Sequence, residues 1–477
     1  MKKCVILLCL CVLSSFLTAQ NKQLLYGVDG LPQTLMLNPG SNITFNKHIG
    51  IPFFSQIHVN FGSTGINAFD IFEDSQVVSI NQRILNVLNR ISTNDFVEVN
   101  QQFEILSFGW QNNKNYYFSG GLYQEVDAIS YLPKNFALLG YQGNAGSNIG
   151  KPFSFNEIKA QGEAVAVWHF GVNKKVSKDL RLGGRFKIYS SLVDFRSTDN
   201  KGTFITEETP NGPNFYKHSL LNANVKIQTS GYSELDDLPE GSTPKDVFGV
   251  LAGRYFFGGN LGLGVDLGLT YTLNDAWSLS ASVLDLGFIS HTKNVETYRA
   301  SGSYELDGIE LEFPENNNDP APPYYQQLSD AIEAAVPIDT LTINYTTLRP
   351  VKLNAGLNYG FSNTYRACNC YATGDELYDN NVGLQLYAVK RPRAFSGAAT
   401  LYYDKRITNG VRGKLTYTID AFSYTNIGAL IAVTGKTFNF YIAADNLLSY
   451  RNLAKANALS LQLGFQFIIT KEWWNIS

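Results

Sequence analysis

The chain has 477 residues, and its 38 Lys and Arg against 41 Asp and Glu give a formal net charge of −3. This balance excludes a basic nucleic-acid-binding protein, because neutralising phosphates needs an excess of Lys and Arg. Aromatic residues make up 13% and charged residues 17%, which excludes a disordered chain and leaves a large β-rich protein. The mean hydropathy of −0.12 argues against a membrane protein built from many helices.

Residues 1–19 are predicted to be a secretory signal peptide. Lys2 and Lys3 precede an apolar run that starts at Cys4, and the small residue Ala19 follows it. The run is too short to span a bilayer as a helix. Cleavage after Ala19 leaves a mature chain whose cysteines are Cys368 and Cys370, which we interpret as incidental loop residues.

Residues 20–46 are predicted to form an N-terminal plug. This stretch contains a short apolar run that ends at Asn38-Pro39-Gly40. Such a run followed by Asn, Pro and Gly is typical of a buried turn ahead of a strand.

Residues 47–470 predict an all-β fold, a transmembrane antiparallel β-barrel. Segments of about ten residues alternate between apolar and polar side chains, as in 459–469, where Leu459, Leu461 and Leu463 alternate with Ser460 and Gln462. One such segment is also compatible with a soluble sandwich. Many of them, joined by alternately short and long connections, favour a closed barrel in a membrane.

The connection lengths predict about 14 strands, with both chain ends on the periplasmic side. A first strand at 47–61 and a last at 458–470 flank six pairs, at 96–110 with 115–127, 155–172 with 178–195, 258–272 with 276–289, 347–361 with 381–389, 395–406 with 412–422, and 426–434 with 437–444. We place a β-bulge near Val283, where the alternation changes phase.

Two large external insertions are predicted, at 196–257 and 290–346. The first carries a hairpin near 204–208 and 216–228, and the second a hairpin and a helix near 324–335. If either insertion crosses the membrane, the strand count becomes 16. An amphipathic helix is predicted at 81–91, and residues 471–477 form a C-terminal tail.

Charged residues gather on the polar faces of two neighbouring strands and predict a ladder in the lumen. The ladder comprises Glu157, Lys159, Glu163, Arg181, Arg185 and Lys187. Folding about a turn near Lys175 places Glu163 opposite Lys187, or opposite Arg185 after a two-residue slip. The ladder either solvates the barrel wall or takes part in conduction.

We find no pattern that indicates catalysis or cofactor binding. The five histidines are scattered without metal-ligand spacing, and no nucleophile elbow is present. We therefore expect neither an enzyme nor a metal or cofactor site.

Several short motifs carry a resemblance to known barrels. Asn38-Pro39-Gly40, together with 264–271, 285–289 and 441–447, resembles the FadL-type fatty-acid transporters and the outer-membrane barrels of the gliding and type-nine secretion lineages, related to the PorV and PorP/SprF groups. The resemblance implies a plugged barrel of about 14 strands. Barrels of this kind often end at an aromatic residue of the last strand. This sequence departs from that pattern, because it extends past Phe467 of the predicted last strand to residue 477.

Two functions follow as hypotheses for a protein of the cell outer membrane, in contact with its lipid. The first is a structural or partner component of a surface-protein secretion or assembly complex. The alternative is a FadL-like plugged channel for uptake of a small hydrophobic compound.

Overall fold

The computed structural model describes residues 22–73, 77–112, 114–212, 214–239, 241–308, 324–365 and 377–469. The predicted signal peptide 1–19, the tail 471–477, Cys368 and Cys370 lie outside the described residues. Within the described part of the chain, no helix is both long and apolar enough to cross a bilayer.

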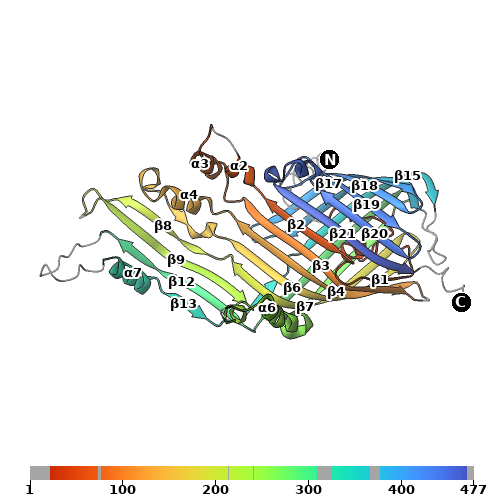
Figure 1. The fold of residues 1–477 in the computed structure, drawn as a ribbon, viewed down its shortest axis with the longest axis horizontal. Coiled ribbons are helices and arrows are strands. Elements are labelled where there is room, and N and C mark those ends of the chain that lie inside the picture. The colour runs from red at the N-terminus through yellow and green to blue at the C-terminus, as the bar shows by residue number, and fades with distance from the viewer. Residues whose placement is uncertain are drawn as a thin grey trace, which may run out of the picture.

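The strands form one antiparallel sheet that closes into a barrel (Figure 1). The first strand is split into β1 (Lys47–Gly50) and β2 (Ile57–Ser63), and both halves pair with the second and the last strand, which closes the ring. The ring continues through β3 (Phe96–Gln111), β4 (Tyr116–Tyr131), β6 (Ala160–Lys175), β7 (Leu180–Ser197), β10 (Asn260–Thr272), β11 (Trp277–His291), β14 (Tyr345–Leu348) with its continuation β15 (Lys352–Tyr365), β16 (Leu377–Lys390), β17 (Phe395–Thr408), β18 (Val411–Ile419), β19 (Asn426–Thr434), β20 (Phe438–Asp445) and β21 (Ala458–Ile469).

The ring has 14 strand positions in the described residues, because β1 and β2 share one position and β14 and β15 share another. The predicted all-β barrel of about 14 strands is therefore confirmed. The alternative count of 16 is wrong, because the strands of the two insertions lengthen the wall instead of widening the ring.

Four strands of the insertions form a sheet extension that rises from one side of the barrel. It consists of β8 (Lys201–Glu208), β9 (Tyr216–Ser230), β12 (Val295–Leu306) and β13 (Ile338–Leu341), and β9 pairs with the upper end of β7. The short strand β5 (Phe153–Ser154) pairs with β8. In Figure 1 the extension lies beyond the barrel, with α7 (Tyr324–Ala335) beside it, where the sequence predicted a helix.

The other helices belong to the external connections, at the end of the barrel from which the extension also rises. They are α2 (Ala68–Phe72), α3 (Ile80–Arg90), α4 (Lys134–Gln142), α5 (Ser233–Asp236) and α6 (Pro244–Gly253). The predicted amphipathic stretch corresponds to α3, whose apolar face packs Val87 and Leu88 against Leu138 of α4.

The outer face of the barrel is apolar, as the alternation requires. Exposed Leu, Val and Phe side chains cover the strands, and an aromatic row marks the end with the short turns. This row contains Trp110, Tyr271, Trp277, Tyr359 and Phe467. An apolar band bordered by aromatic residues is typical of barrels in lipid.

The register between β6 and β7 differs from the prediction. The connection lies at 176–179, so Lys175 pairs with Arg181 and Glu163 lies opposite Asp194. The predicted pairing of Glu163 with Lys187 or Arg185 is therefore wrong, although the two strands are neighbours. The Lys-rich turn contains no Gly or Pro to mark it, and a bulge between Ala164 and Val165 shifts the register further.

The bulge predicted near Val283 is present. The register of β10 and β11 shifts between the pairs Val265–Leu286 and Leu267–Val283. Asp285 has a positive φ of 60° at this point, which turns its backbone N–H toward the carboxylate of Asp266 at 2.7 Å. The bulge thus brings two carboxylates of the lumen face together.

Candidate functional site

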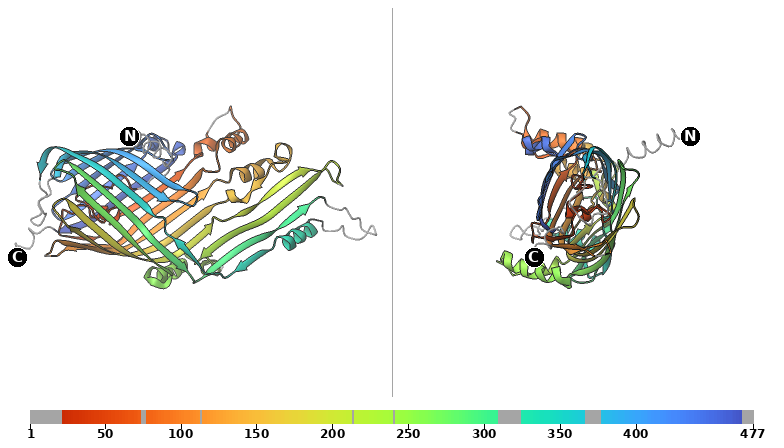
Figure 2. Two further views of the ribbon diagram at one scale, coloured as in Figure 1. Left: turned by 180° about the vertical axis from the view of Figure 1, so that it is seen from behind. Right: turned by 90° about the vertical axis from the view of Figure 1, so that its right-hand side faces the viewer.

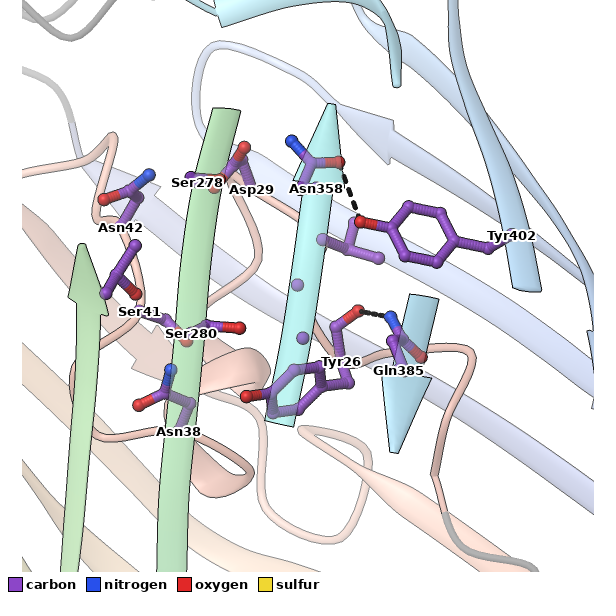
Figure 3. A pocket seen from close by; sticks show the side chains of 14 residues that line it. Tyr26, Asp29, Asn38, Ser41, Asn42, Ser278, Ser280, Asn358, Gln385 and Tyr402 are labelled. Atoms are coloured by element: carbon purple, nitrogen blue, oxygen red, sulfur yellow. Dashed lines mark hydrogen bonds between the residues drawn. The ribbon is translucent and has the colours of Figure 1, made fainter. Parts of the chain in front are cut away.

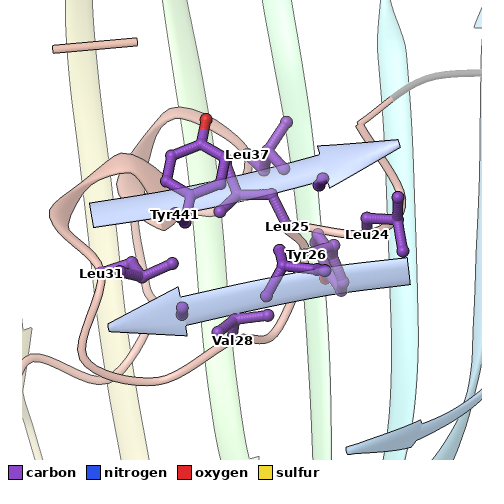
Figure 4. Close-up of a cluster of buried hydrophobic side chains, with 10 residues drawn as sticks. Leu24, Leu25, Tyr26, Val28, Leu31, Leu37 and Tyr441 are labelled. Carbon is purple, nitrogen blue, oxygen red and sulfur yellow. The ribbon is translucent and has the colours of Figure 1, made fainter. Parts of the chain in front are cut away.

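The N-terminal segment, residues 22–46, lies inside the ring of strands, where the end-on view in Figure 2 shows it. Its apolar side chains are almost completely buried and form a cluster with one patch of the inner wall (Figure 4). The cluster consists of Leu24, Leu25, Tyr26, Val28, Leu31 and Leu37 of the segment with Leu430, Ala432, Tyr441 and Ala443 of β19 and β20.

The wall patch is unusual because it makes the lumen face of β19 apolar. Ile427 and Ile431 face outward and are exposed, whereas Leu430 and Ala432 face inward and are buried. The interior of a membrane barrel is ordinarily polar, so an apolar row that faces the lumen indicates that apolar side chains pack on it. This contact is not among the predictions made from the sequence, although the continuous apolar run of β19 indicates it.

Polar groups of the wall satisfy backbone carbonyls of the segment. The amide of Gln385 donates to the carbonyl of Tyr26 at 2.8 Å, and the Lys414 ammonium donates to the same oxygen at 2.7 Å. In the other direction, Gln33 of the short 3-10 helix η1 (Pro32–Met36) donates to the Ser55 carbonyl at 3.0 Å. Such bonds are needed because a buried segment without regular pairing would otherwise leave its carbonyls unsatisfied.

The turn at Asn38-Pro39-Gly40 is fixed against β6, β7 and β10. Asn173 donates to the carbonyls of Pro39 at 2.6 Å and of Ser41 at 3.0 Å, and Thr270 donates to the carbonyl of Gly40 at 2.9 Å. Two wall glycines leave room for the turn. A Cβ at Gly183 would lie 1.9 Å from the Pro39 oxygen, and one at Gly268 would lie 2.1 Å from Asn38 Oδ1.

A chain of buried ion pairs lies beside the segment. Asp266 contacts Arg185 at 3.2 Å and Lys187 at 2.9 Å, and Lys187 continues to Asp285 at 2.6 Å. From Asp285 the chain passes to Lys352 at 3.0 Å. Thus cations of β7 are bound by carboxylates of β10 and β11, which are the next strands around the ring.

The chain then crosses the lumen. Lys352 contacts Glu125 of β4 at 2.5 Å, and Arg349 contacts the same carboxylate at 2.9 Å and also pairs with Glu163 of β6. All eight side chains of the chain are at most 10% exposed, and four cations balance four carboxylates. Balance matters because an unpaired charge at such depth costs several kcal/mol.

A second group of ion pairs joins opposite walls. Arg391 directly follows β16, the ninth position of the ring, and its guanidinium pairs with Glu98 of β3 at 3.1 Å and with Asp127 of β4. Since β3 is the second position, the Arg391–Glu98 pair spans seven of the 14 positions. We call the contacts of Arg349, Lys352 and Arg391 with β3, β4 and β6 the cross-lumen pairs.

The structure separates the six residues of the predicted charge ladder. Glu163, Arg185 and Lys187 belong to the buried chain, and Arg181 lies near the short turn with a bond to Asn173 at 3.0 Å. Glu157 and Lys159 precede β6, so neither belongs to the strand that the sequence analysis gave them. Instead, Glu157 accepts from the backbone of Asn135 at 3.1 Å in an external loop.

A small cavity remains between the N-terminal segment and the wall (Figure 3). Its volume is about 60 Å³, and its lining is mostly hydroxyl and amide groups from the segment and from β10, β11, β15, β16 and β17. Tyr402 donates to Asn358 at 2.7 Å across this lining. A space of this size and polarity suits a few water molecules.

The described residues contain no group of three or more His, Cys, Asp and Glu side chains that could hold a metal ion.

A family model matches residues 39–445, and its description is a family of unknown function, DUF5723. The chain belongs to this family. The match begins at Pro39, within the turn that the wall glycines accommodate, and ends at the last residue of β20. The matched region thus covers most of the barrel, and the description of the family assigns no activity.

Comparison with solved structures finds other barrels at low identity. The toluene transporter TodX of Pseudomonas putida has a TM-score of 0.36 at 11% identity, with 92% of each chain covered. The monoaromatic hydrocarbon channel CymD has 0.37 at 11% identity, with 92% of this chain and 93% of the other covered. The translocator domain of the autotransporter NalP from Neisseria meningitidis has 0.31 at 8%, with 89% of each chain covered.

Likeness at these TM-scores carries no argument about function. A comparison with curated proteins finds no match. The resemblance to the PorV and PorP/SprF groups stays a prediction, and the barrel itself is established by the strand pairing described above.

Proposed function

We propose that this member of the family is a non-enzymatic outer-membrane barrel with a closed lumen, acting as a structural or partner component of a complex that secretes or assembles surface proteins. The proposal rests mainly on one observation: the interior holds the N-terminal segment and is bridged by ion pairs. The N-terminal segment packs against the inner wall, and Arg391 joins strands on opposite sides of the ring. The apolar outer band supports the membrane location.

A closed barrel acts through its surfaces, and the sheet extension supplies one. It presents large apolar side chains to solvent, with Phe215 83% and Ile338 72% exposed. The two side chains lie at different heights of the extension, and each offers an apolar contact point for a partner protein. The extension is therefore the part of the molecule that we expect a partner protein to contact.

The test is co-purification from cells in mild detergent with Phe215 and Ile338 replaced by Asp. We expect a partner that co-purifies in stoichiometric amount with the native protein to be lost from this variant. Val77→Asp is the matched control, because Val77 is 92% exposed but lies in the connection between α2 and α3. Retention of the partner by the extension variant, or equal loss in the control, contradicts the assignment.

The second candidate is a plugged channel for a small hydrophobic compound. The observation that favours it is the N-terminal segment, which is held in the lumen by side-chain contacts and is not a strand of the wall. The cavity beside the segment is polar and far smaller than the roughly 300–1,000 Å³ of typical ligand sites, so uptake requires the segment to move. Uptake of a labelled monoaromatic compound by proteoliposomes, compared with empty liposomes, tests this candidate.

A further inference from the structure

The polypeptide between β9 and β10 leaves the wall and lies on the outside of the barrel. It contains α5, α6 and a short irregular helix, η4 (Arg254–Gly258). The end-on view in Figure 2 shows α6 projecting sideways from the ring. This placement differs from that of the sheet extension, which continues the wall along the barrel axis.

The element is anchored on the outer wall by its C-terminal part. The indole of Trp168 on β6 donates to the carbonyl of Tyr255 at 3.0 Å, and its ring lies 5.9 Å from that of Phe256 and 5.6 Å from that of Phe257. Leu251 and Tyr255 pack on a cluster of outward-facing side chains on β4, β6 and β7. The orientation of the element is thus set by contacts with the wall.

Arg254 also holds this element in place through hydrogen bonds. Its guanidinium donates to the carbonyl of Gly231 at 2.8 Å and to Glu234 of α5 at 2.5 Å, and it also binds the carbonyl of Leu192. Arg254 is buried, so these bonds replace its hydration. The result is a rigid connection between the wall and α6.

The outer side of α6 and η4 is apolar and uncovered. Phe248 is 67% and Phe256 is 66% exposed, and Val247 lies beside them with more than a third of its surface free. The helix begins with a capping box in which Thr243 donates to Asp246, and these bonds lower the pKa of the Asp246 carboxyl. Exposed Phe side chains on one side of such a helix are of the kind that interfacial helices bury at the headgroup boundary.

The position of η4 along the barrel axis indicates what covers the apolar side of α6 and η4. Strand β10 runs from Asn260, directly after η4, to the aromatic row at Tyr271, and its outward side chains are Leu261, Leu263, Val265 and Leu267. The ten steps along the strand from Leu261 to Tyr271 rise roughly 25 Å, at about 3.3 Å per step and a tilt of about 40°. This equals the height of the apolar band in such barrels, so η4 lies at its external border.

We propose that α6 and η4 form an interfacial anchor that inserts Phe248 and Phe256 into the outer leaflet of the membrane in which the barrel sits. The exposed phenyl rings continue the lipid-facing surface of β10 at the level of the headgroups. The ligand is the lipid itself, held by an apolar side that reaches beyond the barrel wall. The inference rests on the membrane location proposed above.

The experiment measures spin-label accessibility in liposomes of phosphatidylcholine and phosphatidylglycerol. Cys368 and Cys370 are replaced by Ser, and single cysteines are introduced as Phe248→Cys, Val265→Cys and Phe215→Cys. Val265 lies in the middle of the apolar band and Phe215 at the tip of the β8–β9 hairpin. Folding of each variant is checked by its shifted migration on unboiled gels.

We expect the label at Phe248 to collide with dissolved oxygen more often than the label at Phe215 and less often than the label at Val265, because oxygen is most concentrated at the centre of a bilayer. It should collide several-fold less often with a water-soluble nickel chelate than the label at Phe215. A label at Phe248 that behaves like that at Phe215 overturns the anchor while leaving the barrel in the membrane. A label at Val265 that is also open to nickel overturns the membrane location itself.

Discussion

At the scale of single residues, Gly183 and Gly184 of β7 offer a matched pair for testing how the N-terminal segment is held. A Cβ at Gly183 would collide with the Pro39 carbonyl, whereas one at Gly184 would meet its nearest atoms at 3.9 Å. We predict that Gly183→Ala displaces the segment, because overpacking of this kind costs about 1–3 kcal/mol. Limited proteolysis in detergent should then cut within residues 22–46 much faster than in the native protein.

Gly184→Ala is the control, since ordinary van der Waals contact leaves the wall unchanged. Equal cleavage rates in the two variants would show that the turn at Pro39 does not depend on the space beside Gly183.

A second residue-scale prediction concerns Arg391. Replacing it with Ala leaves Glu98 and Asp127 buried without their partner, which costs about 3–5 kcal/mol. We predict that this variant unfolds at a clearly lower urea concentration than the native protein. The measurement is the loss of the folded band on unboiled gels as urea is raised. Adding Glu98→Gln and Asp127→Asn to the Arg391→Ala protein should recover part of the loss, because the stranded charges are then removed.

Arg90→Ala serves as the control for Arg391. Arg90 pairs with Asp70 at 2.6 Å, but its side chain is 54% exposed, so the pair contributes about 0–1 kcal/mol. If Arg391→Ala lowers the urea midpoint no more than Arg90→Ala does, the cross-lumen pairs do not stabilise the barrel.

At the scale of elements, the strands of the barrel were largely predictable. The predicted 426–434 coincides with β19, and the predicted 458–470 differs from β21 by one residue. Period-two alternation combined with Gly-containing or Asn-containing turns defines such strands locally. The β6–β7 register was not predictable, because it depends on a Lys-rich turn and a bulge that no residue pattern marks.

The contents of the lumen were predictable only in part. Glu163, Arg185 and Lys187 are recognisable as inward-facing because they alternate with apolar residues. Their partners are not, since Arg349 lies at the start of the predicted strand 347–361, between β14 and β15, and Arg391 lies beyond the end of the predicted strand 381–389. A connection faces a particular strand across the lumen only once the whole sheet has closed into a ring. Local sequence patterns do not reveal that arrangement.

Two features obstruct the lumen, the N-terminal segment and the cross-lumen pairs. We predict that deleting residues 22–40 raises planar-bilayer conductance only slightly, because the cross-lumen pairs still join opposite walls. Combining the deletion with Arg349→Ala and Arg391→Ala should raise conductance well above the sum of the separate effects. If the increases in conductance simply add, the N-terminal segment and the cross-lumen pairs do not block the same path through the barrel.

At the scale of the whole molecule, the outer surface predicts where the protein is found. Exposed Leu, Val and Phe side chains cover the barrel above the aromatic row, and a soluble protein rarely exposes so large an apolar area. We predict that cell fractionation recovers the mature protein in the outer membrane, with heat-modifiable migration on gels. Recovery as a soluble periplasmic protein contradicts a membrane barrel.

The position of the N-terminal segment also constrains the order of events during biogenesis. The segment precedes the first strand yet lies inside the ring, and the seam between β1, β2 and β21 is the last pairing that a growing sheet can complete. We predict that residues 22–46 enter the lumen before that seam seals. A bulky fusion placed ahead of Lys22 should stall the insertion pathway at an open-seam intermediate, whereas the same fusion on an external loop should not.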